Sequence, residues 1–175
     1  MEKLKIYFID SNHINYLRKY DSKVAYNNVP NRPYIGVVYK YNGFHYFAPL
    51  SSPKPKHTKL KNSTIDIFKI KDGKLGIINT NNMFPTPIEA LIEAIPNIHD
   101  KKYKALLIEQ LDFINHHREV LYHKVKQFQQ RYRKGYIQQH VLERCYNFSI
   151  IRKKCIEYTQ NNFKYIDKEE QLSFN

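Results

Sequence analysis

The residues best suited to chemistry lie in one run, FAPLSSPKPKHTKLK, at residues 47–61. Two serines follow an apolar segment, and a loop stiffened by proline then carries four lysines and one histidine. Hydroxyl groups, a restrained backbone and ammonium groups together suit a phosphodiester. The candidate catalytic residues of this run are Ser51, Ser52, Lys54 and His57.

RNA can be cleaved without a metal when its own 2′-hydroxyl attacks the adjacent phosphorus. The protein must then align the attack, neutralise the phosphorane and move two protons. Lys54 and Ser52 fit binding and charge stabilisation, and His57 is the nearest group with a suitable pKa for proton transfer. Lys54 with a depressed pKa is an alternative. The competing interpretation is a solvated loop that only binds phosphate.

The other histidines carry weaker indications of a role in proton transfer or metal binding. His13 lies at the start of an expected short helix and is a second candidate for proton transfer, while His45 lies on an expected strand. His116 and His117 are adjacent and point about 100° apart on a helix, with no cluster of thiols or carboxylates around them. We therefore expect no metal and no cofactor.

The overall charge favours a polyanionic partner. Lys and Arg number 29 against 16 Asp and Glu, which gives a net charge of +13. A basic stretch at residues 118–154 is interleaved with tyrosines that suit base stacking, although a solvated helix face is the alternative. The expected RNA-binding residues are Lys56, Lys59, Lys61, Arg118, Lys124, Arg131, Arg133, Lys134, Arg152 and Lys153.

The elements that must position these residues begin with β-prone segments. Residues 4–9 predict a strand, and a helix capped by Asp10, Ser11 or Asn12 follows through residue 20. Asn42-Gly43 between residues 34–41 and 44–50 predicts a tight hairpin. A second hairpin is expected over residues 64–79, turning at Asp72-Gly73. Residues 83–95 fit a helix and a strand equally well.

The later half has helical spacing. A helix capped by Asp100 is expected first, then a second ending near Gly135, then a third capped by Asn147. We therefore expect one α+β domain over residues 1–175. It comprises a β-rich core (1–95), a helical part (96–165) and a frayed tail (166–175).

Several classes of protein are disfavoured. Cys145 and Cys155 form no CxxC pair and fit free thiols in a reducing compartment. The first residues show no apolar signal core, and no run is long enough to span a membrane, so a cytoplasmic location is expected. No glycine-rich phosphate loop or dinucleotide fingerprint is present, which leaves ATP-driven and redox chemistry without support.

Five ordered blocks carry a resemblance to a known family: YFIDSNHINYLRKYDSKV, RPYIGVVY, NGFHYFAPLSSPKPKH, KLGIINTNNMFP and CYNFSIIRKK. Over about 160 residues the chain resembles the ToxN/AbiQ toxins of type III toxin–antitoxin systems. The resemblance implies a metal-independent endoribonuclease that leaves 2′,3′-cyclic phosphate and 5′-hydroxyl ends. It also implies a repetitive pseudoknot RNA antitoxin that the toxin processes, closed toxin–RNA rings such as three of each, cellular or phage RNA substrates, and phage defence.

The resemblance extends to fold and site. It implies a twisted antiparallel sheet closed like the small barrel of the MazF/Kid/CcdB toxins, with added C-terminal helices, and favours strand over residues 88–95. The family's active-site motif falls on Ser51, Ser52 and Lys54, and a family tyrosine falls on His13, where imidazole would replace phenol. Tyr26 matches an RNA-contacting tyrosine, and Arg32 follows in the same loop. Two alternatives are a non-catalytic RNA-binding module and a gyrase-poisoning toxin on a related barrel.

Overall fold

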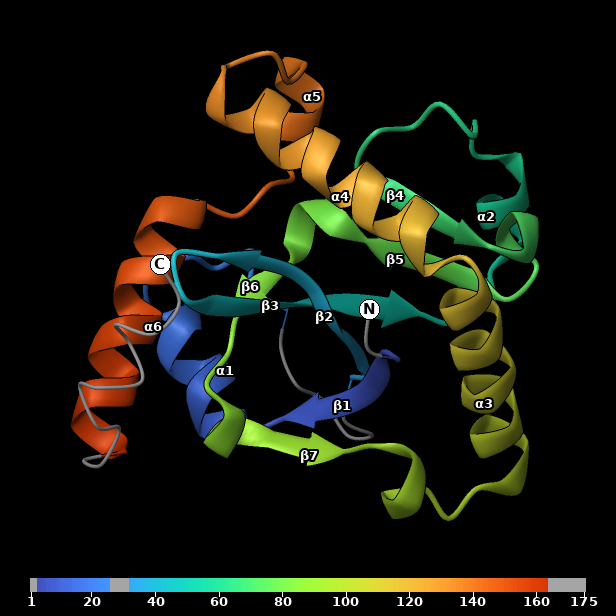
Figure 1. Cartoon of the computed structure of the whole chain (residues 1–175), viewed down its shortest axis with the longest axis horizontal. Coiled ribbons are helices and arrows are strands. Elements are labelled where there is room, and N and C mark those ends of the chain that lie inside the picture. Colours follow the sequence, from blue (N-terminus) through green and yellow to red (C-terminus); the bar gives the residue numbers. More distant parts are fainter. Residues whose placement is uncertain (1–2, 26–31, 164–175) are drawn as a thin grey trace.

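The computed structural model describes residues 3–25 and 32–163. Within these ranges seven strands form one antiparallel sheet in the order β4-β5-β3-β2-β1-β7, and β6 pairs with β3 (Figure 1). The expected tail at 166–175 and Tyr26 lie outside the described residues. The strands are β1 Lys5–Ile9, β2 Tyr34–Tyr41, β3 Phe44–Ser51, β4 Ile67–Ile70, β5 Gly76–Asn79, β6 Phe84–Pro85 and β7 Leu91–Glu93.

The helices confirm the α+β class. The expected caps are present: side chains of Asp10, Asn147 and Asp100 accept backbone N–H bonds at the starts of α1, α6 and α3. Two short helices, α2 and α5, were not predicted from the sequence. The α-helices are α1 Ser11–Arg18, α2 Pro55–Lys59, α3 Lys101–His116, α4 Arg118–Arg133, α5 Gln139–Leu142 and α6 Phe148–Asn162.

Strand β3 is apolar on both faces, and helices cover both. Alternate residues point to opposite sides, so that Ala48 joins one core with α3 and α4, whereas Phe47 joins a second core with α1 and α6. Figure 1 shows α6 beside α1 at one end and α4 crossing the β4–β5 end. Gly36 makes room for Phe47, because a Cβ at Gly36 would lie 2.0 Å from the Phe47 ring.

The first hairpin is confirmed in its turn and in the bounds of β2, and β3 ends at Ser51, one residue later than expected. Asn42 and Gly43 both adopt positive φ, at 48° and 75°, which matches the right-handed twist of β2 and β3. The second expected hairpin pairs β4 with β5, but its turn differs from the expected two residues. Ile70 pairs with Gly76, so five residues connect the strands, and the 3-10 turn η1 (Lys71–Gly73) lies inside that connection.

The expected antiparallel sheet with added C-terminal helices is confirmed, but within the described residues the sheet is open, so its expected closure like a small barrel is wrong. Strands β4 and β7 end the hydrogen-bonded order, and each is only three or four residues long. Residues 83–95, where helix and strand were equally expected, form β6, β7 and the 3-10 turn η3 (Ile88–Ala90). Two further 3-10 turns are η2 (Thr80–Asn82) and η4 (Ile95–Asn97). None of the helices in the described part of the chain is long and apolar enough to cross a membrane.

His13 is a buried residue of the second core, which corrects its expected role in proton transfer. Its side chain is 0% exposed, its Nε2 donates to the Pro85 carbonyl at 3.3 Å, and its ring packs 4.8 Å from that of Tyr158. Burial lowers the pKa of His13 from 6.5 to about 4. Figure 1 also places α1, which carries His13, far from α2.

Burial of neutral His13 predicts acid sensitivity. The unfolded chain takes up a proton near pH 6.5 and the folded chain near pH 4, so stability is present above pH 6.5 and falls as the pH drops through this window. The loss is about 3 kcal/mol at 1.36 kcal/mol per pKa unit. Denaturant unfolding at several pH values should show a shallower acid decline for His13→Gln than for the wild type. Parallel declines would contradict the assignment.

Candidate active site

The candidate site begins where β3 ends. Ser51 is the last residue of β3 and pairs with Ile77 of β5, and its Oγ accepts a hydrogen bond from Asn79 Nδ2 at 3.0 Å. Ser52 and Lys54 follow as exposed residues. Lys54 is extended, with φ −140° and ψ 147°, immediately before α2. Three sequence-predicted residues, Ser51, Ser52 and Lys54, therefore lie together at one strand end.

Helix α2 begins at Pro55, whose fixed φ suits the first position of a helix. A hydrogen bond connects the end of this helix to strand β4: Lys69 Nζ donates to the carbonyl of Leu60, the residue just past α2, at 3.0 Å. Thr58 Oγ1 donates back to the Pro55 carbonyl at 3.0 Å. The Lys69 bond holds the end of α2 against β4, and the Thr58 bond closes a turn within α2.

The turn between β4 and β5 supports this loop through two glycines. A Cβ at Gly73 would lie 2.5 Å from the His57 carbonyl oxygen, and one at Gly76 would lie 2.0 Å from the Ser51 carbonyl oxygen. Both glycines adopt positive φ, at 87° and 107°. Only glycine allows the turn to approach both ends of the candidate loop this closely.

A shallow pocket with a volume of ≈ 300 Å³ adjoins Lys54. Its lining includes Pro53, Thr58, Gly73 and Lys74 in addition to Lys54. Lys74 is exposed and was not singled out by sequence reasoning. In the sequence, the only indication was that Lys74 follows the expected turn at Asp72-Gly73. The fold then places this turn against α2. Two ammonium groups at one pocket make a site for an anion.

His57 is not available as an exposed proton donor or acceptor. Its side chain is 2% exposed, and its Nδ1 has no hydrogen-bond partner within the described ranges. Burial, assisted by the ammonium groups of Lys54 and Lys56, lowers the pKa of His57. The expected role of His57 in proton transfer is therefore corrected: its side chain is buried on α2, the helix that packs against the η1 turn.

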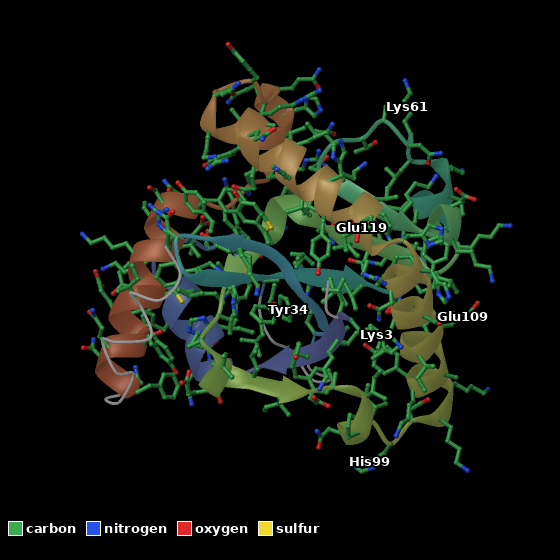
Figure 2. The ribbon with its side chains drawn as sticks, in the orientation of Figure 1. Lys3, Tyr34, Lys61, His99, Glu109 and Glu119 are labelled. Atoms are coloured by element: carbon green, nitrogen blue, oxygen red, sulfur yellow. The ribbon has the colours of Figure 1, made fainter. Side chains whose placement is uncertain are left out.

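The expected RNA-binding lysines of the loop are exposed. Lys56 and Lys59 lie on α2, and Lys61 projects outward from the connection between β3 and β4 in Figure 2. Lys124 of α4 has a structural contact instead, since its Nζ donates to the Asn62 carbonyl at 3.4 Å. Arg118 likewise donates to the Asn115 carbonyl at 3.0 Å, at the junction of α3 and α4.

A second basic group lies at the hairpin end of the sheet. The guanidinium carbons of Arg133 and Arg152 lie 4.9 Å and 5.5 Å from the centre of the Tyr41 ring. A hydrogen bond from Arg133 is the main cause of a lowered pKa at Tyr41. Tyr41 adjoins Phe44, which is seven residues, or about 23 Å, from Ser51 along β3. The helical arginines are thus remote from Lys54.

The other expected RNA-binding residues are dispersed. Arg131, Lys134 and Lys153 are exposed on α4, after α4 and on α6, respectively. Arg32 is half-buried, two residues before the start of β2. The structure therefore brings the predicted cations into two groups, one around α2 and one around Tyr41, with others spread over the surface between helices.

Comparison with known proteins identifies the family. The sequence-family model described as toxin ToxN of the type III toxin–antitoxin system matches residues 5–155 of this chain. The chain belongs to the ToxN family. Endoribonuclease ToxN of Pectobacterium atrosepticum is 36% identical over 122 residues, which cover 63% of this chain and 71% of that protein.

Solved structures agree with this ToxN fold. AbiQ, a lactococcal anti-phage endoribonuclease belonging to the type III toxin–antitoxin system, superposes with a TM-score of 0.78 at 26% identity, covering 91% of this chain and 99% of AbiQ. A solved structure described as showing selective toxin inhibition by a non-coding RNA pseudoknot superposes with a TM-score of 0.73 at 29% identity. The match covers 91% of this chain and 99% of that chain. The ToxN fold thus includes the open sheet and the helices described above.

Two glycines of this ToxN-family chain provide a matched pair of variants that tests whether the η1 turn supports α2. Gly73 and Gly43 both have positive φ, but nothing lies within 4 Å of a Cβ at Gly43. Gly43→Ala should cost about 1 kcal/mol of unfolding free energy from backbone strain. Gly73→Ala should cost about 1–3 kcal/mol more through overpacking against His57. Urea unfolding measures both, and equal losses would show that the turn does not support α2.

Proposed function

We propose that this chain is a metal-independent endoribonuclease toxin of a type III toxin–antitoxin system. The observation that carries the proposal is the exposed Ser52–Lys54 segment after the end of β3, beside a pocket that is also lined by Lys74. The endoribonuclease names of its relatives support the same activity. The products are a 2′,3′-cyclic phosphate and a 5′-hydroxyl end.

In the proposed reaction the 2′-oxygen bonds to phosphorus and the bond from phosphorus to the 5′-oxygen breaks. The 2′-hydroxyl loses a proton, and the leaving oxygen gains one. Lys54 binds and stabilises the charged phosphate oxygens, while Ser52, assisted by Ser51, orients the phosphate or relays a proton. Because His13 and His57 are buried, alignment and charge stabilisation carry the catalysis in this proposal.

The proposed partner is a small repetitive RNA antitoxin that folds as a pseudoknot and that the toxin processes. Support comes from a similar structure described as inhibited by a non-coding RNA pseudoknot, and from another in which a processed non-coding RNA regulates an antiviral system. The loop lysines and the arginines around Tyr41 would hold its phosphates. Closed rings such as three toxins with three RNAs, cellular or phage RNA substrates, a cytoplasmic site of action and phage defence complete the proposal.

Removing the Lys54 ammonium tests the proposed catalysis. Lys54→Ala should lower RNA cleavage roughly 100-fold or more, because a preorganised charge at the phosphorane is lost. The assay is cleavage of a mixed RNA pool in EDTA, with end-group mapping of the products. The wild type should leave 2′,3′-cyclic phosphate ends.

The control for Lys54→Ala is Lys102→Ala, which removes an exposed lysine from the first turn of α3. It should cleave at the wild-type rate. If neither the wild type nor Lys54→Ala cuts while both bind RNA in a salt-dependent way, the chain is a non-catalytic RNA-binding module and the proposed reaction is wrong.

The Tyr41 group predicts a salt effect on binding without a loss of chemistry. Arg133→Ala and Arg152→Ala should each weaken binding of the antitoxin RNA and reduce the slope of log K against log salt by about 0.7. Cleavage of a short substrate that reaches only the Lys54 pocket should be unchanged, since the two groups lie at opposite ends of β3, which spans about 23 Å from Phe44 to Ser51. Unchanged salt slopes would remove this group from the RNA path.

A further inference from the structure

A hydrogen bond links the side chain of Asn79 to Ser51 of the candidate site, and the proposed reaction assigns Asn79 no role. It ends β5, and its backbone pairs with Ile67 of β4. Its side chain lies diagonally across the ladder from Ser51, because Ser51 pairs with Ile77 two residues earlier. The Asn79 amide nitrogen reaches the Ser51 hydroxyl at 3.0 Å.

The direction of this hydrogen bond has a chemical consequence. A serine hydroxyl has one proton to donate and two lone pairs that accept. When the amide N–H of Asn79 occupies a lone pair of Ser51, the hydroxyl proton stays free for another acceptor. A hydroxyl that accepts one bond also donates a stronger one, because bonds in a chain polarise each other.

The backbone at Ser51 is fixed as well. Gly76 approaches its carbonyl so closely that a Cβ there would lie 2.0 Å from the oxygen, and Ser51 is paired in the ladder to Ile77. The hydroxyl is therefore held from the sheet side by Asn79. The next residue along the chain, Ser52, is exposed and leads to the Lys54 pocket.

We propose that Asn79 is a positioning residue that orients the Ser51 hydroxyl, so that Ser51 donates its proton to a non-bridging oxygen of the scissile phosphate. This inference rests on the proposed ribonuclease function. Asn79 does not touch the RNA in this proposal. It acts through Ser51, next to the charge that Lys54 neutralises.

A double-mutant cycle tests whether Asn79 acts through Ser51. Asn79→Ala should lower kcat about tenfold in the wild-type background, because the misoriented Ser51 hydroxyl loses its hydrogen bond to the charged phosphate. In the Ser51→Ala background the same change should have no further effect. If Asn79→Ala slows Ser51→Ala by the same factor as it slows the wild type, the inference is overturned.

Asn79→Asp gives a second readout that a structural defect would not produce. An ionised carboxylate accepts the Ser51 proton and turns it away from the phosphate, whereas a protonated one donates as Asn79 does. The cleavage rate relative to the wild type should therefore rise several-fold as the pH is lowered from about 8 towards the ordinary carboxyl range near 4. A constant ratio overturns the inference. Asn161→Asp, at an exposed position of α6, is the control and should give a constant ratio near one.

The outcomes separate this inference from the function on which it rests. Cleavage by the wild type in EDTA tests the function alone. If the wild type binds RNA without cutting it, the proposed function fails, and the same cycle is then measured on the Kd for RNA. Coupling of Asn79 and Ser51 in Kd would still support the inferred orientation, whereas additive losses would overturn it.

Discussion

The arrangement of the candidate site depends on how tightly one strand end is held. Ser51 closes β3, and the β4–β5 unit touches it through the ladder, through the close approach of Gly76 and through the Asn79 amide. Strand β3 is itself clamped between two apolar cores, one on each face. A residue held in this way has little backbone freedom left to lose when a ligand binds, so the binding energy need not be spent on ordering the loop.

Much of the fold follows from local signals in the sequence. The Asn42-Gly43 turn, the caps at Asp10, Asp100 and Asn147, and the helical spacing of the later half are each decided within a few residues. The Ser51–Lys54 cluster is local for the same reason. What the sequence does not reveal is burial. His13 and His57 look like proton donors in a polar sequence, yet long-range packing places both in the interior.

The remaining differences also arise from contacts between distant segments. Whether a twisted antiparallel sheet closes depends on whether its outer strands meet, and no local pattern in β4 or β7 states this. Lys74 and Asn79 enter the site only because β5 pairs with β3. The net charge indicates a polyanionic partner. It does not show which cations form hydrogen bonds within the protein, as Lys69 and Lys124 do, and which are available to a ligand.

The open sheet also bears on how copies of this chain can associate. Sheet edges are natural templates for joining one chain to another, but here β4 and β7 offer four and three residues. At β7 a lysine–glutamate pair, Lys5 with Glu93, bridges to β1, and at β4 the Lys69 side chain reaches over to the α2 segment. Edges this short and this charged give a second copy few backbone groups to bond. The described edges of the sheet therefore disfavour an assembly in which β-structure continues from one copy to the next.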